Sequence, residues 1–274
     1  MLNYLINSIR RKIARRVKRE YPVSIKSLST PEYGDIQYTI WHNPLVNPTE
    51  LQLSHCWFFK KFLSQGDMAI DIGANVGHMS ICMGVVTGKD GLVLSFDPNP
   101  VVFKILTKNA ELNKELTHIE PHNFAITDKE EEFYYSSSEA SFSNGGISKE
   151  KNSRHGKYTL DTKIKGVKLE DFLQEKYASK LSRLKLVKID TEGYDKEIIK
   201  SIRGLLEKYK PAVITECFSK NKAEARYEQF NLLHDLGYSL YYFSSFTIDA
   251  EVIPIQTKEE MMNWKHFDIY AVQK

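Results

Sequence analysis

From residue 51 onward, short apolar runs alternate with segments of helical periodicity. The apolar runs predict seven strands, at Met68–Ile72, Leu92–Phe96, Glu120–Phe124, Leu184–Ile189, Ala212–Glu216, Tyr238–Phe243 and Phe267–Ala271. The periodic segments predict helices over residues 51–64, 77–86, 99–113, 169–181, 194–208 and 221–236. This alternation is typical of an α/β fold with a mostly parallel sheet and helices on both faces.

Two parts of the chain lack the alternation. Residues 130–168 are rich in Ser, Asn, Gly and Lys, with strand-like pieces at Phe133–Tyr135 and Tyr158–Leu160, and they predict an inserted hairpin or loop that could contact a substrate. Residues 1–50 begin with a helical pattern and continue with turn-forming residues. We therefore predict a helical and irregular extension over residues 1–50 and a main domain over residues 51–274.

The composition is that of an ordinary globular protein. Of the 274 residues, 42% are hydrophobic and 27% are charged, which excludes a disordered or fibrous chain. The three cysteines, Cys56, Cys82 and Cys217, form no closely spaced pair, so buried thiols are favoured over a disulfide or a zinc site. No apolar run approaches the roughly 20 residues needed to cross a bilayer. These features predict a soluble, cytoplasmic protein.

Positive charge is concentrated in residues 1–20, which hold seven Lys and Arg residues and one acid, whereas the rest of the chain is mildly acidic. Apolar residues recur there at helical spacings, at Leu2, Leu5, Ile6, Ile9, Ile13 and Val17. Docking of this apolar stripe on the body or on a second subunit is the favoured interpretation. An anionic membrane surface, at the inner face of the membrane, is the next. Nucleic acid is the least favoured, because the segment holds a single aromatic residue, Tyr4.

A glycine-bearing turn follows the first predicted strand of the main domain, in the run Asp71-Ile-Gly73-Ala74-Asn75-Val-Gly77. Ligands of open α/β sheets bind beyond the carboxyl ends of the strands, and glycines let the backbone approach them closely. The spacing is neither that of a dinucleotide fingerprint nor that of a P-loop. An acid before the turn favours a cationic ligand.

Carboxylates also end three other predicted strands. Asp97 follows the second strand, where an acid suits the two hydroxyls of a ribose, so a nucleoside-bearing cofactor is indicated. Asp190 and Glu192 follow the fourth strand and point the same way if strand geometry continues, and Glu216 ends the fifth. The three could orient an amine, accept a proton or hold a divalent ion, and the metal role is not favoured.

These motifs together resemble the FkbM family of S-adenosylmethionine-dependent methyltransferases over about residues 50–274. The resemblance rests on the glycine turn, on Phe96-Asp-Pro98-Asn-Pro, on Asn123-Phe124-Ala125 and on Lys188-Ile-Asp-Thr-Glu-Gly. It implies a seven-stranded sheet in the order 3-2-1-4-5-7-6, with the seventh strand antiparallel. Asp97 stands where the family more often has Glu, and Tyr194 where a smaller residue is common.

The resemblance also implies which residues bind the cofactor. Asp71, Gly73, Ala74, Asn75 and Gly77 would cradle its methionine part, Asp97 and Pro98 its ribose, and Asn123, Phe124 and Ala125 its adenine. Asp190 and Glu192 would lie beside the sulfonium and the methyl acceptor.

We therefore predict an O-methyltransferase that acts on a sugar hydroxyl of a polysaccharide, glycan or glycosylated metabolite. The candidate bases are Glu192, Asp190 and Glu216, in that order. Tyr134, Tyr135 and the polar loop 136–146 could contact a carbohydrate. Two alternatives remain: an RNA 2′-O-methyltransferase that uses the basic N-terminal segment as a phosphate anchor, and a membrane-associated cofactor-binding protein.

Overall fold

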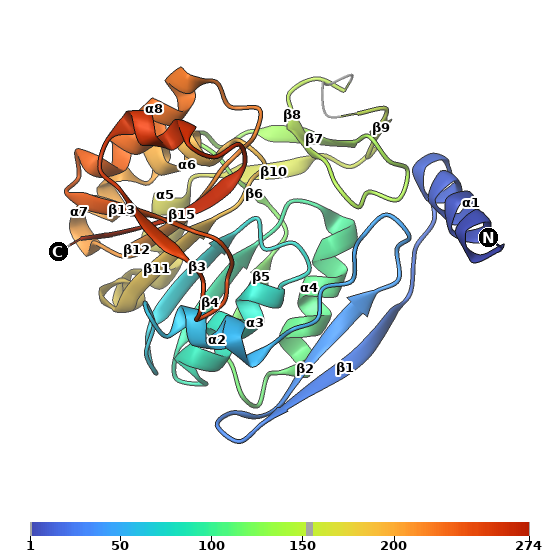
Figure 1. Cartoon of the computed structure of the whole chain (residues 1–274), viewed down its shortest axis with the longest axis horizontal. Helices are drawn as coiled ribbons and strands as arrows, with labels where there is room; N and C mark the ends of the chain where they lie inside the picture. Colours follow the sequence, from blue (N-terminus) through green and yellow to red (C-terminus); the bar gives the residue numbers. More distant parts are fainter. Residues whose placement is uncertain (1, 152–155, 274) are drawn as a thin grey trace.

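The computed structural model describes residues 2–151 and 156–273 (Figure 1). Residues 152–155 of the predicted insertion, residues 1 and 274, and the side chains of residues 2 and 3 lie outside this description. The main sheet has eight strands in the order β14-β13-β15-β12-β11-β3-β4-β5. Their bounds are β3 (Met68–Ile72), β4 (Leu92–Phe96), β5 (Ile119–His122), β11 (Leu184–Ile189), β12 (Ala212–Cys217), β13 (Tyr238–Phe243), β14 (Val252–Ile255) and β15 (Phe267–Gln273).

The seven predicted strands are all present. Numbered along the chain without β14, they lie in the order 3-2-1-4-5-7-6, and the seventh, β15, is antiparallel to both of its neighbours. The predicted number of strands is too low by one, because β14 pairs with β13 at the edge of the sheet. Pro254 lies inside β14, and a proline within an apolar run is tolerated only at such an edge.

Helices cover both faces of the sheet, as predicted. Alternate strand residues such as Ala69 and Val93 pack on one face against α2 (Leu53–Phe59) and α3 (His78–Thr87). Their neighbours, such as Ile70 and Leu94, pack on the other face. The helices there are α5 (Leu169–Tyr177), α6 (Asp195–Ser201), α7 (Arg203–Tyr209) and α8 (Ala223–His234). A helix predicted over 194–208 is divided into α6 and α7 at Ile202. The 3-10 turns are η1 (Ala178–Arg183) and η2 (Lys258–Met262).

The prediction that residues 21–50 are irregular is wrong. Residues Val23–Thr30 (β1) and Gly34–Trp41 (β2) form an antiparallel hairpin. Its inner strand buries Ile36, Tyr38 and Ile40 against the core, and asparagines of α4 (Pro100–Leu112) and its C-cap accept hydrogen bonds from β2 backbone N–H groups. The hairpin is therefore held by the main domain, by contacts that no local pattern encodes.

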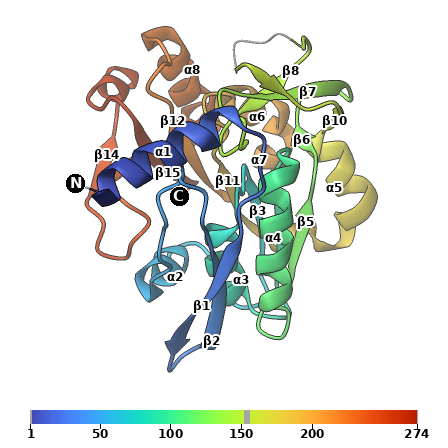
Figure 2. The same cartoon turned by 90° about the vertical axis from the view of Figure 1, so that its right-hand side faces the viewer.

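The predicted insertion is confirmed for the part that the structure describes. A small second sheet contains β6 (Ala125–Ile126), β7 (Glu132–Ser137), β8 (Gly146–Ser148), β9 (Tyr158–Thr159) and β10 (Ile164–Val167). It lies beyond the carboxyl ends of the main-sheet strands (Figures 1 and 2).

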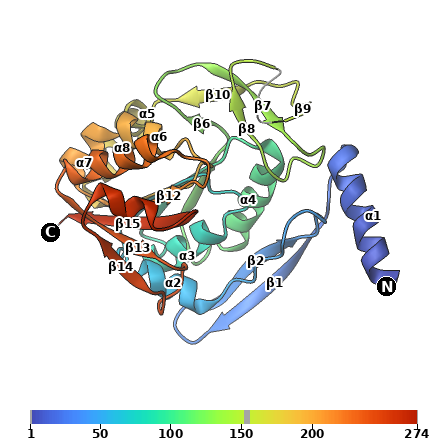
Figure 3. The same ribbon diagram turned by 45° about the horizontal axis from the view of Figure 1, so that its top comes forward.

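The predicted N-terminal helix is also present, as α1 (Leu2–Arg16), and it lies at the margin of the molecule beside the insertion (Figure 3). The favoured docking of its apolar stripe on the body is not seen, because side chains of the stripe from Leu5 onward are exposed. In the described part of the chain, no helix is both long and apolar enough to span a membrane.

Candidate active site

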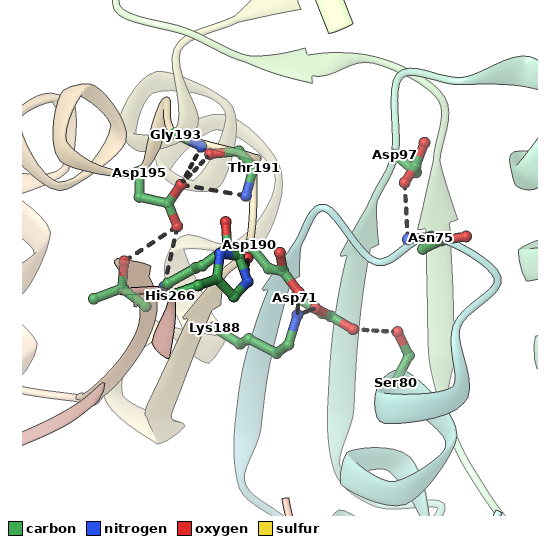
Figure 4. A network of polar contacts seen from close by, with 12 residues as sticks. Asp71, Asn75, Ser80, Asp97, Lys188, Asp190, Thr191, Gly193, Asp195 and His266 are labelled. Atoms are coloured by element: carbon green, nitrogen blue, oxygen red, sulfur yellow. Dashed lines mark hydrogen bonds and ion pairs between the residues drawn. The ribbon is translucent and has the colours of Figure 1, made fainter. Parts of the chain in front are cut away.

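The tips of β3, β4 and β11 lie next to one another and bring Asp71, Asp97 and Asp190 to one region (Figure 4). Backbone hydrogen bonds interlock the loops: Gly73 N donates to Phe96 O at 2.9 Å, and Asp190 N donates to Ile72 O at 2.9 Å. The three predicted acids therefore share one site.

The glycine turn needs its glycines for steric reasons. Gly73 has a φ of +77°, and a Cβ there would lie 1.8 Å from the carbonyl oxygen of Asp190. Gly77 has a φ of +85°, and a Cβ there would lie 2.4 Å from Leu106 Cδ1. Asn75 has a φ of 51°, a left-handed conformation that asparagine tolerates. The turn thus lies directly against the β11 tip and α4.

We expect Gly73→Ala to lower the free energy of unfolding by more than about 3 kcal/mol, because strain and a clash with backbone coincide. Gly237→Ala is the matched control: Gly237 has a φ of +82°, but no atom of the described residues lies within 4 Å of the added Cβ. That variant should lose only about 1–2 kcal/mol. Guanidinium denaturation measures both, and equal losses would show that the contact with Asp190 is not tight.

Asp97 links the β4 tip to the glycine turn. Its Oδ2 accepts a hydrogen bond from Asn75 N and its Oδ1 one from Asn99 N, both at 2.8 Å. Asn123 Nδ2 donates to the carbonyl oxygen of Asp97 at 2.9 Å. Burial raises the pKa of Asp97 to about 7 despite the two backbone donors.

The other residues assigned to the cofactor lie around this link. Ala74 is buried in the turn, Pro98 is half-buried next to Asp97, and Ala125 is buried in β6. Phe124 packs with the rings of Phe96, His122 and Phe172. An aromatic wall of this kind suits the flat face of a purine.

Lys188 is a buried cation that sequence reasoning assigned no role. Its Nζ lies 3.3 Å from Asp71 Oδ1 and 3.3 Å from Asp190 Oδ2. Ser80 Oγ donates to the other oxygen of Asp71 at 2.6 Å. Asp71 is fully buried, so its charge is balanced by this ammonium inside the protein. A lysine in the middle of an apolar strand was the signal for this role.

The loop after β11 leaves strand geometry, so Asp190 and Glu192 are not held on one face as they would be in a continued strand. Glu192 has a φ of 56°, and its side chain is exposed. Asp195, which sequence reasoning missed, is buried and holds this loop to β12. It accepts hydrogen bonds from Thr191 Oγ1 at 2.9 Å and from Glu216 N at 3.2 Å. Burial raises the pKa of Asp195.

Glu216 is the penultimate residue of β12 and lies next to His266, another residue that the sequence analysis missed. Its Oε1 lies 3.0 Å from His266 Nε2, while its buried Oε2 has no hydrogen-bond partner among the residues that the structure describes. Burial, and then the charge of Asp190, raises the pKa of Glu216 to about 8. Asp268, the residue opposite Glu216 on β15, has a pKa raised to about 7, again chiefly by burial.

These carboxylates outnumber the buried cations beside them. Lys188 compensates Asp71 and Asp190, and Asp97, Glu216 and Asp268 hold raised pKa values around it. A cationic ligand would relieve this excess of negative charge. Within residues 2–151 and 156–273, no group of three or more His, Cys, Asp or Glu side chains is placed to hold a metal ion.

Comparison with known proteins identifies the family. The model of the methyltransferase FkbM domain matches residues 71–240, which is more than half of the chain and includes every residue assigned above except His266 and Asp268. This chain belongs to the FkbM methyltransferase family. The match begins at Asp71 and covers the glycine turn, Asp97, the segment at Asn123 and the Asp190–Glu192 loop.

Individual relatives are distant. "Methyltransferase sdnD" of Sordaria araneosa is 24% identical over 225 residues, which are 70% of this chain and 80% of that protein. "Protein-L-isoaspartate O-methyltransferase" of Caenorhabditis elegans is 25% identical over 77 residues. That match covers 28% of this chain and 34% of the nematode protein.

Solved structures of methyltransferases resemble the chain at low identity. FkbM methyltransferase of Methylobacillus flagellatus KT has a TM-score of 0.48 and 11% identity, with 79% of this chain and 50% of that chain covered. Precorrin-6y C5,15-methyltransferase of Geobacter metallireducens has a TM-score of 0.43 and 13% identity, with 83% and 94% covered.

S-adenosylmethionine is the methyl donor of the FkbM methyltransferases, and its sulfonium cation fits this site. The excess of carboxylates around Lys188 is the observation that supports the fit. Asp97, the glycine turn and the aromatic wall at Phe124 are the groups that would hold the nucleoside.

We expect the affinity for S-adenosylmethionine to rise with pH by about tenfold between about pH 6 and pH 9. Below their raised pKa values of about 7 to 8, Asp97, Asp268 and Glu216 are neutral, and they become negative as the pH rises. Only the ionised forms attract the sulfonium, so binding should release protons.

S-adenosylhomocysteine is the control ligand, because its sulfur is uncharged while the rest of the molecule is the same. Its affinity should depend less on pH. Titration calorimetry in two buffers of different ionisation enthalpy measures both the affinity and the proton release. Equal pH slopes for the two ligands would contradict the electrostatic account.

Proposed function

We propose that this FkbM methyltransferase transfers the methyl group to a hydroxyl oxygen, and that the acceptor is a sugar in a polysaccharide, a glycan or a glycosylated metabolite. The observation that carries the proposal is Glu216, a buried carboxylate with a pKa raised to about 8 and with one oxygen to which no described residue donates a hydrogen bond. A hydroxyl is a poor nucleophile until its proton is removed, and a base is most effective when its pKa lies near the working pH.

Glu216 replaces Glu192 as the first candidate for this base. Glu192 is exposed and lies after the strand, and Asp190 is paired with Lys188. Glu216 is held by His266 on one oxygen, which leaves the other free to accept a proton from the acceptor. Glu192 then lies where it can contact a more distant part of the acceptor.

The donor, when bound, supplies an activated methyl group with a good leaving group at sulfur. The residues of the chain then have to align the acceptor oxygen with the methyl carbon and exclude water. In the proposed reaction the carbon–sulfur bond breaks, a carbon–oxygen bond forms, and the hydroxyl proton passes to Glu216. Lys188 fixes Asp71 and Asp190, and Asp195 holds the 191–193 loop against β12.

A sugar acceptor is supported by the polar insertion above the site and by the resemblance to the family. Tyr135 is part of the hydrophobic cluster of the insertion, so its ring is not available to stack on a sugar. Tyr134 is half-buried and remains a candidate, as do the side chains of Ser138 and Asn144 near the turn of the insertion.

The test is an acceptor panel with radiolabelled S-adenosylmethionine, containing oligosaccharides, glycosylated small molecules, RNA and peptides. We expect label in the saccharide or glycoside fraction, in a methyl ether that survives mild alkali. Label that alkali releases would indicate a carboxyl ester, and label in RNA would indicate the 2′-O alternative. Either result, or a methylamine product, would overturn the proposal.

A further inference from the structure

The apolar stripe of α1 is exposed from Leu5 to Val17. The exposed fractions are 57% for Leu5, 49% for Ile9 and 41% for Ile13, and Ile6 and Val17 extend the same stripe. These residues recur at spacings of three and four, so they share one side of the helix. An apolar strip of this length in water is costly and points to a binding partner.

Between described residues, the contacts that hold α1 lie at its last turn and not on the stripe. Ala14 is buried, and the carbonyl oxygens of Ala14 and Arg15 accept hydrogen bonds from Ser141 N and Ala140 N, both at 3.1 Å. Figures 1 and 3 show the rest of the helix standing clear of the main sheet. The stripe is therefore presented outward by an anchored helix.

Basic side chains accompany the stripe. Arg10, Arg11, Lys12, Arg15 and Arg16 lie on α1, Lys18 and Arg19 follow it directly, and the described part of α1 holds no acid. Lys and Arg can extend their charged groups to the level of phosphates while their methylene stems lie along apolar surface.

We propose that α1 binds the surface of an anionic phospholipid bilayer and holds this methyltransferase there. The stripe would enter the boundary between headgroups and acyl chains, and the bases would contact lipid phosphates. One partner thus accounts for both properties of the helix.

Other partners account for one property each. Nucleic acid would neutralise the bases but leave the isoleucines in water. Packing of the stripe against α1 of a second copy would cover the isoleucines but bring two strongly basic helices together, without compensating acids on either described helix.

The segment that holds the last turn of α1, residues 140–142, also contacts the cofactor side of the active site. The loop that binds the last turn of α1 continues to Phe142, whose carbonyl oxygen accepts a hydrogen bond from Asn99 Nδ2 at 2.8 Å. Asn99 N in turn donates to Asp97. Binding of α1 to lipid would therefore place the site a short distance from the bilayer, within reach of an acceptor attached to it.

Vesicle co-sedimentation of the full chain tests the proposal. We expect the protein to sediment with vesicles that contain phosphatidylglycerol and to stay in solution with pure phosphatidylcholine, and a rise in salt from about 0.1 M to about 1 M should weaken binding. The double variant Ile9→Glu/Ile13→Glu should lower the partition coefficient at least about tenfold. Ile25→Glu is the matched control, since Ile25 is 48% exposed but belongs to β1 and not to the apolar stripe of α1. This variant should bind vesicles like the parent protein.

Because all three isoleucines are exposed, the variants should fold, and unchanged affinity for S-adenosylmethionine will establish it. The proposal is overturned if the parent protein ignores anionic vesicles, or if the double variant still sediments with them. Light scattering and an RNA-binding assay identify the alternatives: a dimer that the double variant dissociates, or RNA binding without vesicle binding, would each assign α1 to that partner instead. Neither outcome depends on the acceptor proposed for methyl transfer.

Discussion

Glu216→Gln is expected to lower kcat by roughly 10²–10⁴-fold while the affinity for S-adenosylmethionine stays within about threefold of the parent value. Glutamine keeps the shape of the side chain and can still contact His266, but it cannot accept a proton. The effect should therefore fall on turnover, measured by release of S-adenosylhomocysteine with a saturating acceptor, and little on folding.

Glu120→Gln is the matched control, because Glu120 also lies 3.0 Å from a histidine, His118. Glu120 belongs to β5, an edge strand of the main sheet that is separated from β12 by three other strands. It should leave kcat unchanged. Glu192→Gln should have a smaller effect than Glu216→Gln. The opposite order, with a nearly active Glu216→Gln, would move the base to Glu192.

Asp97→Asn is expected to weaken binding of S-adenosylmethionine by about 3–4 kcal/mol, or roughly 100- to 1,000-fold. The family resemblance assigns the Asp97 carboxylate to both ribose hydroxyls, and hydrogen bonds to a charged group are worth about 1.5–3 kcal/mol each. The carboxylate also holds the glycine turn through Asn75 N, so asparagine, which keeps one acceptor oxygen, is preferable to alanine.

Asp67→Asn provides the control for this loss. Asp67 also accepts a hydrogen bond from a backbone N–H, that of Ser64, but it lies just before β3, at the end of the sheet away from the site. Both variants should melt within a few degrees of the parent, and only Asp97→Asn should lose affinity in calorimetry. Unaltered affinity in Asp97→Asn would exclude the ribose assignment.

Local sequence pattern predicted the main sheet well because its strands are short, apolar and separated by strong helix and turn signals. Met68–Ile72 and Leu184–Ile189 have the same bounds in the structure as in the prediction. The β1–β2 hairpin escaped prediction because tertiary contacts hold it. Thr39 N donates a hydrogen bond to Asn109 Oδ1, and Asn113 Nδ2 donates one to Gln37 O, and the partners lie some 70 residues apart in the sequence.

The residues of the candidate site also fall into two groups, those that the local pattern predicted and those that depend on tertiary contacts. Asp71 lies near the end of an apolar strand, and Asp97 and Asp190 directly follow apolar strands, so the pattern that revealed the strands also revealed the acids. Asp195 and His266 follow no apolar strand that would single them out. In the sequence Asp195 looks like an ordinary acid in the first turn of a helix. His266 contacts Glu216, which lies 50 residues earlier, only because β15 pairs with β12.

The buried carboxylate of Asp195 has a mechanical consequence. It binds the loop after β11 through Thr191 and β12 through the backbone of Glu216. The loop after β11 and the end of β12 are thereby held together by one side chain. The distance between the loop that follows Asp190 and the candidate base Glu216 should therefore fluctuate less than if each segment moved separately.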